Sequence, residues 1–377
     1  MTGIELGIDR VRATPSLLPA GRVGLITNYT GLTSDLRSNI DVLHDAGVEL
    51  TALFGPEHGI QGSAQAGASE PDVESGPYGI PVYDTYHKSG AELDEIISRS
   101  GVETLVFDIQ DVGSRFYTYA WTMYDCLASA ARLGRQFVVL DRPDPIGGLV
   151  SEGPMAEPEC FSFVGRAAIP TRHGLTIGEL ARHHARTEFP GLEPIVVEMT
   201  GWRPDRYFDQ TGLPWVLPSP NMPTVDTAIA YPGTCLFEGI NINEGRGTTR
   251  PFELLGAPYF DGRLRREFHR RELPGVLLRD TRYIPTFGKY EGESIPAIQV
   301  HVTDRESFRP IDTALHLIEL AQQLYPDDFA WIERKRYPID LLWGSPALRK
   351  AAAPTSLIGP PFRAADWAAP GALIYDR

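Results

Sequence analysis

Polar side chains follow several apolar runs of this sequence at the point where each run stops. Asn28 follows one run, Glu57 and His58 follow the next, and Asp108 and Asp111 follow a third. In an open α/β sheet, ligands bind outside the carboxyl ends of the parallel strands. These residue types and their placement therefore predict a polar site on one edge of one sheet.

The first cluster is the segment 54–59, FGPEHG, which places Glu57 directly after a probable strand. Gly55 and Pro56 predict a sharp exit from that strand, so that Glu57 projects at the sheet edge. A carboxyl group in such a position can act as a general acid or base. The alternative is a turn carboxylate paired with a neighbouring arginine, and these residues alone leave both hypotheses open.

The second cluster is the segment 108–119, DIQDVGSRFYTY, in which two acids, an arginine and two tyrosines fall within twelve residues. Alternation along a strand directs Asp108 to one face and places Asp111 at the strand end. Arg115 is a permanent planar cation suited to a carboxylate ligand, and Tyr117 follows it. The structural alternative is an Asp–Arg pair that braces a turn.

Two further clusters lie later in the chain. The segment 237–253, FEGININEGRGTTRPFE, is rich in charge and in glycine, and its arginines could clamp an anionic group bidentately, although a charged hinge between domains is the alternative. The segment 218–223, PSPNMP, is a stiff frame in which Asn221 offers both a donor and an acceptor. The glycine spacing of segment 237–253 matches neither a P-loop nor a dinucleotide-binding motif.

The bulk composition excludes several classes. The net charge of −14 argues against nucleic acid or an anionic membrane as a partner. The three cysteines are far apart and lack metal-ligand spacing, so neither a disulfide framework nor a metal site is expected. No apolar stretch has the length of a signal peptide or of a membrane span, and we expect a cytoplasmic protein.

Three catalytic motifs are absent from the sequence: G-x-S-x-G, H-E-x-x-H and G-x-G-x-x-G after the first strand. Their absence weighs against an α/β-hydrolase, a zinc protease and a nicotinamide dehydrogenase. A site built from Glu, Asp, Asn, Arg and Tyr is typical of carbohydrate chemistry. Glycosidases commonly place two carboxyl groups around an oxocarbenium-like transition state.

The order of the expected elements predicts an α/β fold with a doubly wound parallel sheet. Strands are expected at 22–28, 49–54, 104–109, 136–140 and 195–199, alternating with helices at 39–46, 91–100, 118–133 and 176–187. Two later strands, 275–284 and 296–302, precede an amphipathic helix at 311–324. We therefore predict a Rossmann-like catalytic domain over residues 1–235 and a smaller α+β domain over residues 236–377 that closes the cleft.

Six motifs in order along the chain carry a family resemblance. FGPEHGIQG, FDIQDVGSRFYTY, DRPDPIGG followed by SEGP, IPTRHGLTIGELA, PSPNMPT and YPGTCLFEGININEGRGTTRPFE resemble the DUF1343 family, the NamZ-like exo-β-N-acetylmuramidases of glycoside hydrolase family 171. The resemblance implies a Rossmann-like domain, a smaller C-terminal domain and a site in the cleft between them. It also implies release of N-acetylmuramic acid from the non-reducing end of peptidoglycan fragments, without a cofactor.

The resemblance also suggests roles for single residues. Glu57 matches the glutamate of the PEHG motif and is the expected general acid/base. Asp111, Glu238 and Glu244 compete for the second carboxylate, and the 2-acetamido group of the substrate could act as the nucleophile instead. The mechanism can be retaining or inverting. The candidates for substrate binding are Asn28, His58, Asp108, Arg115, Tyr117, Asn221, Arg246 and Arg250.

Muramic acid carries a lactyl carboxylate, for which Arg115, Arg246 and Arg250 are the candidate cations. The family has an arginine where this chain has Gln61, and many family members are exported, so that an intracellular role on imported fragments is a hypothesis for this chain. Two other functions stay open: an acyl or phosphoryl transferase that uses the same sheet edge, and a two-lobed sugar-binding protein without catalysis.

Overall fold

The apolar runs form a parallel sheet of six strands in the order β3-β2-β1-β4-β5-β6 in the computed structural model, which describes residues 3–377. The direction of winding reverses between β1 and β4, the arrangement of a doubly wound Rossmann-like sheet. The strands are β1 (Val23–Thr27), β2 (Leu50–Gly55), β3 (Val82–Asp84), β4 (Thr104–Asp108), β5 (Gln136–Leu140) and β6 (Ile195–Val197).

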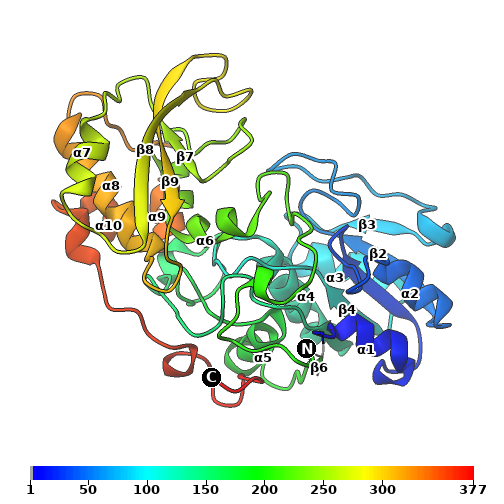
Figure 1. Cartoon of the computed structure of the whole chain (residues 1–377). Helices are drawn as coiled ribbons and strands as arrows, with labels where there is room; N and C mark the ends of the chain where they lie inside the picture. The colour runs from blue at the N-terminus through cyan, green and yellow to red at the C-terminus, as the bar shows by residue number, and fades with distance from the viewer. Residues whose placement is uncertain (1–2) are drawn as a thin grey trace.

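Helices cover both faces of this sheet, and successive strand residues belong to two separate cores. Leu53 and Val138 pack in the core beneath α1 and α2, whereas their neighbours Phe54 and Val139 pack with α3, α4 and α5. Every residue of β1 and β4 is buried, as expected for parallel strands enclosed on both faces. Figure 1 shows the sheet between these helices: α1 (Gly7–Ala13), α2 (Asn39–Asp45), α3 (Gly90–Ser100), α4 (Tyr119–Leu133) and α5 (Ile177–Glu188).

The predicted helix ends agree with the structure. Thr176 and Glu179 form a capping box at the start of α5, in which the Thr176 hydroxyl accepts from the Glu179 amide and the Glu179 carboxylate accepts from the Thr176 amide. Helix α4 ends at Gly134, whose φ of 62° is left-handed. The α/β fold and its main elements are therefore confirmed, and the three-residue strand β3 is the part of this sheet that the sequence did not reveal.

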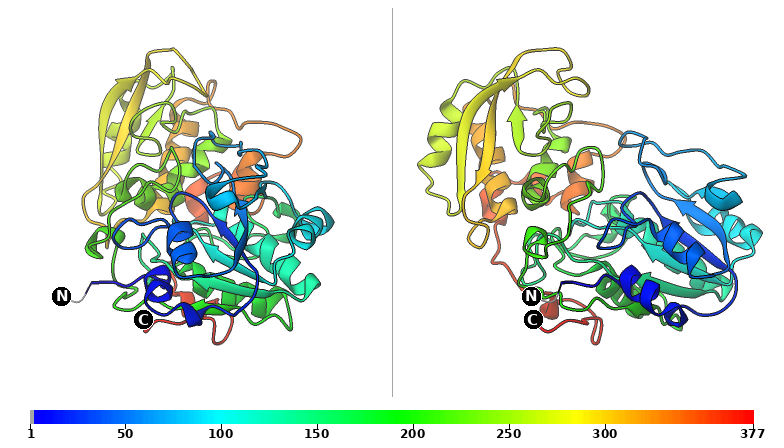
Figure 2. Two further views of the ribbon diagram at one scale, coloured as in Figure 1. Left: turned by 90° about the vertical axis from the view of Figure 1, so that its right-hand side faces the viewer. Right: turned by 45° about the vertical axis from the view of Figure 1, so that its right-hand side comes forward.

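The second lobe contains an antiparallel sheet in the order β7-β9-β8, with helices on one side (Figure 2). Helix α6 packs against α8, and the expected strands and amphipathic helix are found close to their predicted bounds. The elements are α6 (Val225–Thr234), β7 (Leu254–Gly256), α7 (Arg263–His269), β8 (Val276–Tyr283), β9 (Ile295–Val302), α8 (Pro310–Leu324), α9 (Pro338–Trp343) and α10 (Ala347–Lys350).

The end of the chain returns from the second lobe to the parallel sheet (Figure 1). The Tyr375 hydroxyl donates to Asp141 Oδ2 at 2.7 Å and accepts from the amide of Met199 at 2.8 Å. Arg377 pairs with Glu179 at the start of α5. The last residues thus pack on the first lobe, and the domain boundary near residue 235 stays a prediction.

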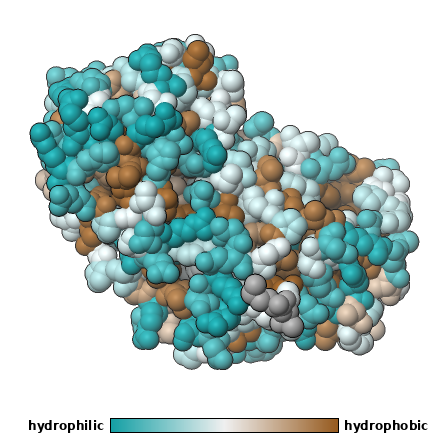
Figure 3. Space-filling view, viewed as in Figure 1, coloured by the Kyte–Doolittle hydropathy of each residue, from teal (hydrophilic) through white to brown (hydrophobic). Residues whose placement is uncertain are grey.

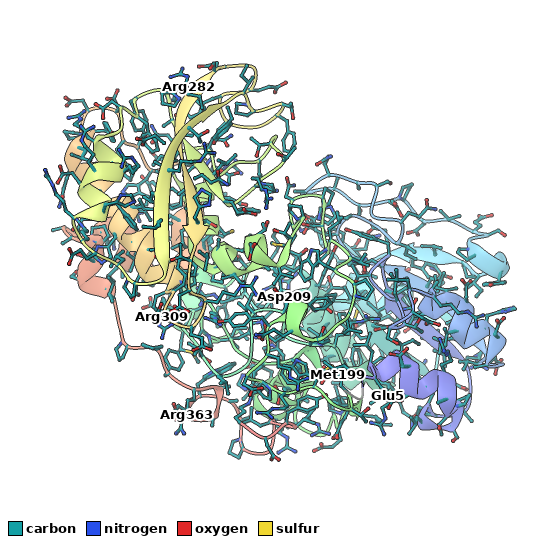
Figure 4. All side chains as sticks on the ribbon, in the orientation of Figure 1. Glu5, Met199, Asp209, Arg282, Arg309 and Arg363 are labelled. Carbon is teal, nitrogen blue, oxygen red and sulfur yellow. The ribbon has the colours of Figure 1, made fainter. Side chains whose placement is uncertain are left out.

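A second link between the lobes is the ion pair of Asp209 with Arg305, at 2.7 Å, and Figure 4 labels Asp209 near the junction. On the face drawn in Figure 3, hydrophobic residues form separate patches among hydrophilic ones, and the outline is notched between the two lobes. No helix within residues 3–377 combines the length and the apolar composition needed to cross a membrane.

Candidate active site

A cavity of about 680 Å³ lies at the carboxyl edge of the parallel sheet, between the two lobes. The first lobe contributes Glu57 and Tyr117 to its wall, and the second lobe contributes Glu238, Arg246 and Phe287. This volume falls in the range of small-molecule sites and is large enough for a sugar ring with its substituents. The cavity therefore lies at the edge where ligands usually bind in such sheets, outside the carboxyl ends of the strands at the point where the strand order reverses.

Glu57 is fixed in the cavity wall by two hydrogen-bond donors. Its Oε1 accepts from the amide of Gly67 at 2.7 Å, and its Oε2 accepts from the hydroxyl of Thr118 at 2.6 Å. The Tyr86 hydroxyl lies 3.4 Å from Oε1. The residue is 8% exposed, so the carboxyl group is shielded from bulk water but still faces the cavity.

The long segment after β2 folds back over Glu57 and supplies one of these donors. The chain turns at His58, whose φ is 70°, and the His58 amide donates to the carbonyl of Ala68 at 2.9 Å. Gly67 has a φ of 83°, a conformation that costs a glycine little and other residues more, and its amide points at the carboxylate. The glycine at position 67 thus allows this segment to bring a backbone donor to the Glu57 carboxylate.

Two buried donors in the cavity wall lack a protein partner. The Tyr117 hydroxyl and Asn221 Nδ2 are both buried, line the cavity and make no hydrogen bond of good geometry with any residue of the described range 3–377, although the Ser219 hydroxyl lies near Tyr117. Burial raises the pKa of Tyr117 well above its usual range, which keeps the hydroxyl protonated and able to donate. Buried donors of this kind are usually satisfied, so a ligand acceptor is expected here.

The frame that holds Asn221 is stiff, as its prolines predict. The Met222 amide donates to the carbonyl of Ser219 at 3.0 Å, and Tyr119 donates from α4 to the carbonyl of Pro218 at 2.8 Å. Trp215 supports the same turn, because its indole donates to Met222 at 3.2 Å. Asn221 is thereby fixed against the start of α4, the helix that Thr118 precedes.

The charged groups on the second-lobe side neutralise one another. Arg246 lies 2.6 Å from Glu238 and 3.3 Å from Glu244, and Glu244 also pairs with Lys289 at 2.8 Å. Burial by itself lowers the pKa of the Arg246 guanidinium, but the charges of Glu238 and Glu244 outweigh this effect, so the pKa is raised. The guanidinium also packs over the ring of Phe252, 5.0 Å from its centroid.

The structure brings half of the expected site residues together around the cavity. Those that line it are Glu57, His58, Tyr117, Asn221, Glu238 and Arg246. Of the three candidates for a second carboxylate, Glu238 alone is in the cavity wall, because Glu244 is turned toward Arg246 and Lys289.

Asp111, Asp108 and Asn28 lie behind the cavity wall, which corrects their expected roles. Asp111 accepts from the Gly113 amide at 2.8 Å and from the ring of His173 at 3.1 Å. The three side chains are buried, and their partners hold loop ends together: Asp108 pairs with Arg142 at 2.6 Å, and Asn28 Oδ1 accepts from the Thr30 amide at 2.9 Å.

Arg115 and Arg250 were also expected to bind the substrate, but neither lines the cavity. Arg115 is fully buried, and its guanidinium donates to the carbonyls of Pro154, Ile169 and Leu342 at 2.6, 2.8 and 2.9 Å. It therefore joins three distant segments and does not face the cavity. Arg250 lies outside the cavity wall and pairs with Glu253 at 3.3 Å.

Several cavity residues were not found from the sequence. Tyr86 and Phe163 form an edge-to-face aromatic pair at one side, and Phe287 and Arg334 come from the second lobe. Each lies in a segment without a motif, and only the fold brings the segments together. Gln61, which stands where the family has an arginine, is exposed and does not line the cavity.

Two family models match this chain. The model described as Exo-beta-N-acetylmuramidase NamZ, N-terminal, matches residues 23–226, and the model described as Exo-beta-N-acetylmuramidase NamZ, C-terminal, matches residues 229–357. The chain is also 45% identical, over 332 residues, to the peptidoglycan beta-N-acetylmuramidase NamZ of Bacillus subtilis (strain 168), a match that covers 87% of this chain and 80% of that protein.

Two crystal structures of DUF1343 family proteins from Bacteroides fragilis have the same fold. The first has a TM-score of 0.83 and 34% identity, and the match covers 93% of this chain and 91% of that one. The second has a TM-score of 0.69 and 26% identity, and the match covers 93% of this chain and 90% of that one.

Proposed function

This chain belongs to the exo-beta-N-acetylmuramidase NamZ family, and we propose that it releases N-acetylmuramic acid from the non-reducing end of peptidoglycan fragments. The observation that carries the proposal is the Glu57 carboxyl group, which two donors hold at the wall of a cavity large enough for a sugar. Glycosidases commonly use a carboxyl group to protonate the leaving oxygen.

Glu57 is the proposed general acid/base. In its protonated form it donates its proton to the glycosidic oxygen while the bond from that oxygen to the anomeric carbon breaks. The shorter sugar chain leaves as an alcohol. A water molecule then adds its oxygen to the anomeric carbon, and the proton that the water loses restores Glu57.

Glu238 is the proposed second carboxylate, because it lines the cavity and Arg246 orients it at 2.6 Å. A negative charge here would stabilise the positive charge that develops at the anomeric carbon. The 2-acetamido group of the substrate is the other candidate for the nucleophile, and Glu238 would then support the ring that forms. Either assignment leaves the proton transfer to Glu57.

Tyr117 and Asn221 are the proposed binding groups for the sugar. Their free donors suit the oxygen atoms of an acetamido group or of ring hydroxyls. His58 lines the same wall, with its Nδ1 2.7 Å from the carbonyl of Ala64, which orients the ring. The proposed substrates are fragments that contain N-acetylmuramic acid linked to N-acetylglucosamine. A cytoplasmic role on imported fragments stays a prediction, which fractionation of the producing cell would test.

The test is hydrolysis of 4-nitrophenyl β-N-acetylmuraminide and of the matching β-N-acetylglucosaminide by the wild-type protein. We expect release of 4-nitrophenol from the muraminide and little from the glucosaminide. Folded protein that binds N-acetylmuramic acid but cleaves neither this glycoside nor the natural disaccharide would instead be a sugar-binding protein. A requirement for an acyl or phosphoryl donor would favour a transferase.

A further inference from the structure

The substrate proposed above differs from its glucosamine counterpart by one carboxylate, and the cavity must distinguish the two. The charged side chains that line it, within residues 3–377 and apart from His58, are Glu57, Glu238, Arg246 and Arg334. An anionic substituent therefore enters a wall that already holds two carboxylates. It needs a cation whose charge is not already compensated.

Arg246 is not that cation. It shares its guanidinium between Glu238 and Glu244, at 2.6 and 3.3 Å, and Lys289 neutralises the remaining charge of Glu244 at 2.8 Å. The four side chains form a balanced set of two acids and two bases. A substrate carboxylate would have to break one of these pairs to bind there, at the cost of an unpaired glutamate.

Arg334 differs from Arg246 in this respect. It is exposed at the mouth of the cavity and makes no hydrogen bond or ion pair with any other residue of the described chain, 3–377. We propose that Arg334 binds the lactyl carboxylate of the substrate and thereby selects N-acetylmuramic acid over N-acetylglucosamine. This inference rests on the proposed function, because it names the side chain that recognises the proposed substrate.

The segment that carries Arg334 is fixed on both sides. Two residues before it, the Ile332 amide donates to the carbonyl of Gly239 at 2.9 Å, which adjoins Glu238. Two residues after it, Arg336 donates to the carbonyl of Phe161 at 3.1 Å in the first lobe, close to the cavity residue Phe163. Arg334 is thus held on a segment that joins the two sides of the cavity mouth.

The chemistry of an arginine suits this role. A guanidinium presents parallel N–H donors that match a carboxylate bidentately. Before substrate binds, water can hydrate the exposed guanidinium, so it needs no protein partner. When a sugar fills the cavity and displaces water, the same charge acts at a lower effective dielectric constant, and the ion pair strengthens.

The experiment compares Arg334→Gln with Lys335→Gln. Lys335 is the next residue, is also exposed and does not line the cavity, so its substitution removes the same charge from the same segment. Binding of N-acetylmuramic acid and of N-acetylglucosamine is measured by calorimetry for both variants and the wild type. Thermal unfolding shows that each protein is folded.

We expect Arg334→Gln to weaken the binding of N-acetylmuramic acid about 10- to 100-fold, the range of a charged hydrogen-bonded pair. Its binding of N-acetylglucosamine and the binding of both sugars by Lys335→Gln should stay within about twofold of the wild type. With the muraminide glycoside, KM should rise in Arg334→Gln while kcat changes little. For a substrate whose lactyl carboxylate is a methyl ester, KM should be the same in Arg334→Gln and in the wild type.

Equal losses in the two variants would overturn the proposal, because they would show a general effect of charge. Unchanged binding in Arg334→Gln, or a wild-type protein without preference for N-acetylmuramic acid, would overturn it as well. The calorimetry needs no turnover, so it separates this inference from the proposed function. A protein that prefers N-acetylmuramic acid through Arg334 but cleaves no glycoside would support the inference and contradict the hydrolase.

Discussion

The hydroxyl of Thr118 donates to Glu57 Oε2 at 2.6 Å, and this bond joins two elements of the first lobe. Glu57 follows β2, and Thr118 is the residue that precedes the first turn of α4. The Thr118 side chain makes no capping bond to its own helix, which leaves its hydroxyl available for the carboxyl group. One oxygen of Glu57 is therefore positioned by a helix and the other by the loop that carries Gly67.

We expect Thr118→Val to lower kcat about tenfold or more, because one donor to the carboxyl group is lost and the group can turn away from the substrate. The change keeps the shape of the side chain. The measurement is steady-state hydrolysis of the natural disaccharide, whose leaving group needs the proton, with Thr122→Val, one turn further along α4 and outside the cavity wall, as the control. An unchanged kcat in Thr118→Val would show that the bond does not position Glu57.

Arg115 should matter for stability and not for substrate binding. We expect Arg115→Met to lower the free energy of unfolding by roughly 3–5 kcal/mol, because the carbonyls of Pro154, Ile169 and Leu342 lose their donors in the interior. Urea unfolding measures this loss, and KM of the folded fraction should stay close to the wild-type value.

The matched control for that experiment is Arg250→Met. Arg250 is about half exposed, and its buried partner Glu253 keeps a hydrogen bond from the Thr227 hydroxyl at 2.6 Å, so the loss of Arg250 should cost less than about 1 kcal/mol. A large rise of KM in either variant would restore the expectation that these arginines bind the substrate.

Asp144 should make the stability of the protein depend on pH. It is buried with Oδ2 unpartnered within the described residues, and burial, reinforced by the charge of Asp111 and opposed by His173 and Arg172, raises its pKa to about 7. An unfolded aspartate titrates near pH 4, so between about pH 4 and 7 the folded state binds more protons than the unfolded state. The contribution of Asp144 to stability therefore falls as the pH rises through this window.

The substitution Asp144→Asn removes this titration and keeps the shape of the side chain. Its Oδ1 can still accept from the Ile146 amide, a bond of 3.1 Å in the native protein. We expect the melting temperature of the variant, relative to the wild type, to increase between pH 5 and pH 8. A difference that is constant or that decreases over this range would contradict the assignment.

The sequence revealed the parallel sheet because its strands are buried on both faces and therefore read as uninterrupted apolar runs. It also revealed Glu57, since a strand end and the Gly-Pro exit place this residue at the sheet edge whatever the rest of the chain does. The short strands β3 and β7, with three residues each, were not recognised, whereas β6, equally short, was recognised because it lies in a longer apolar run.

The roles of the arginines could not be read from the sequence. Arg115 and Arg334 are both arginines in polar segments, but one enters the interior and the other stays at the cavity mouth. What separates them is the position of the carbonyls of Pro154, Ile169 and Leu342, which only the folded chain defines. Sequence reasoning therefore predicted a site at the sheet edge where the cavity lies, but it could not decide which charges belong to the cavity wall.

The most direct test of the central claim compares two leaving groups in the variant Glu57→Gln. In the natural disaccharide the leaving group is a sugar alkoxide, which needs a proton, whereas 4-nitrophenolate is stable enough to leave without one. If Glu57 is the general acid, kcat/KM for the disaccharide should fall by at least about 100-fold more than kcat/KM for the 4-nitrophenyl muraminide, while N-acetylmuramic acid still binds. Equal losses on both substrates, or full activity on the disaccharide, would contradict the role of Glu57 as the proton donor.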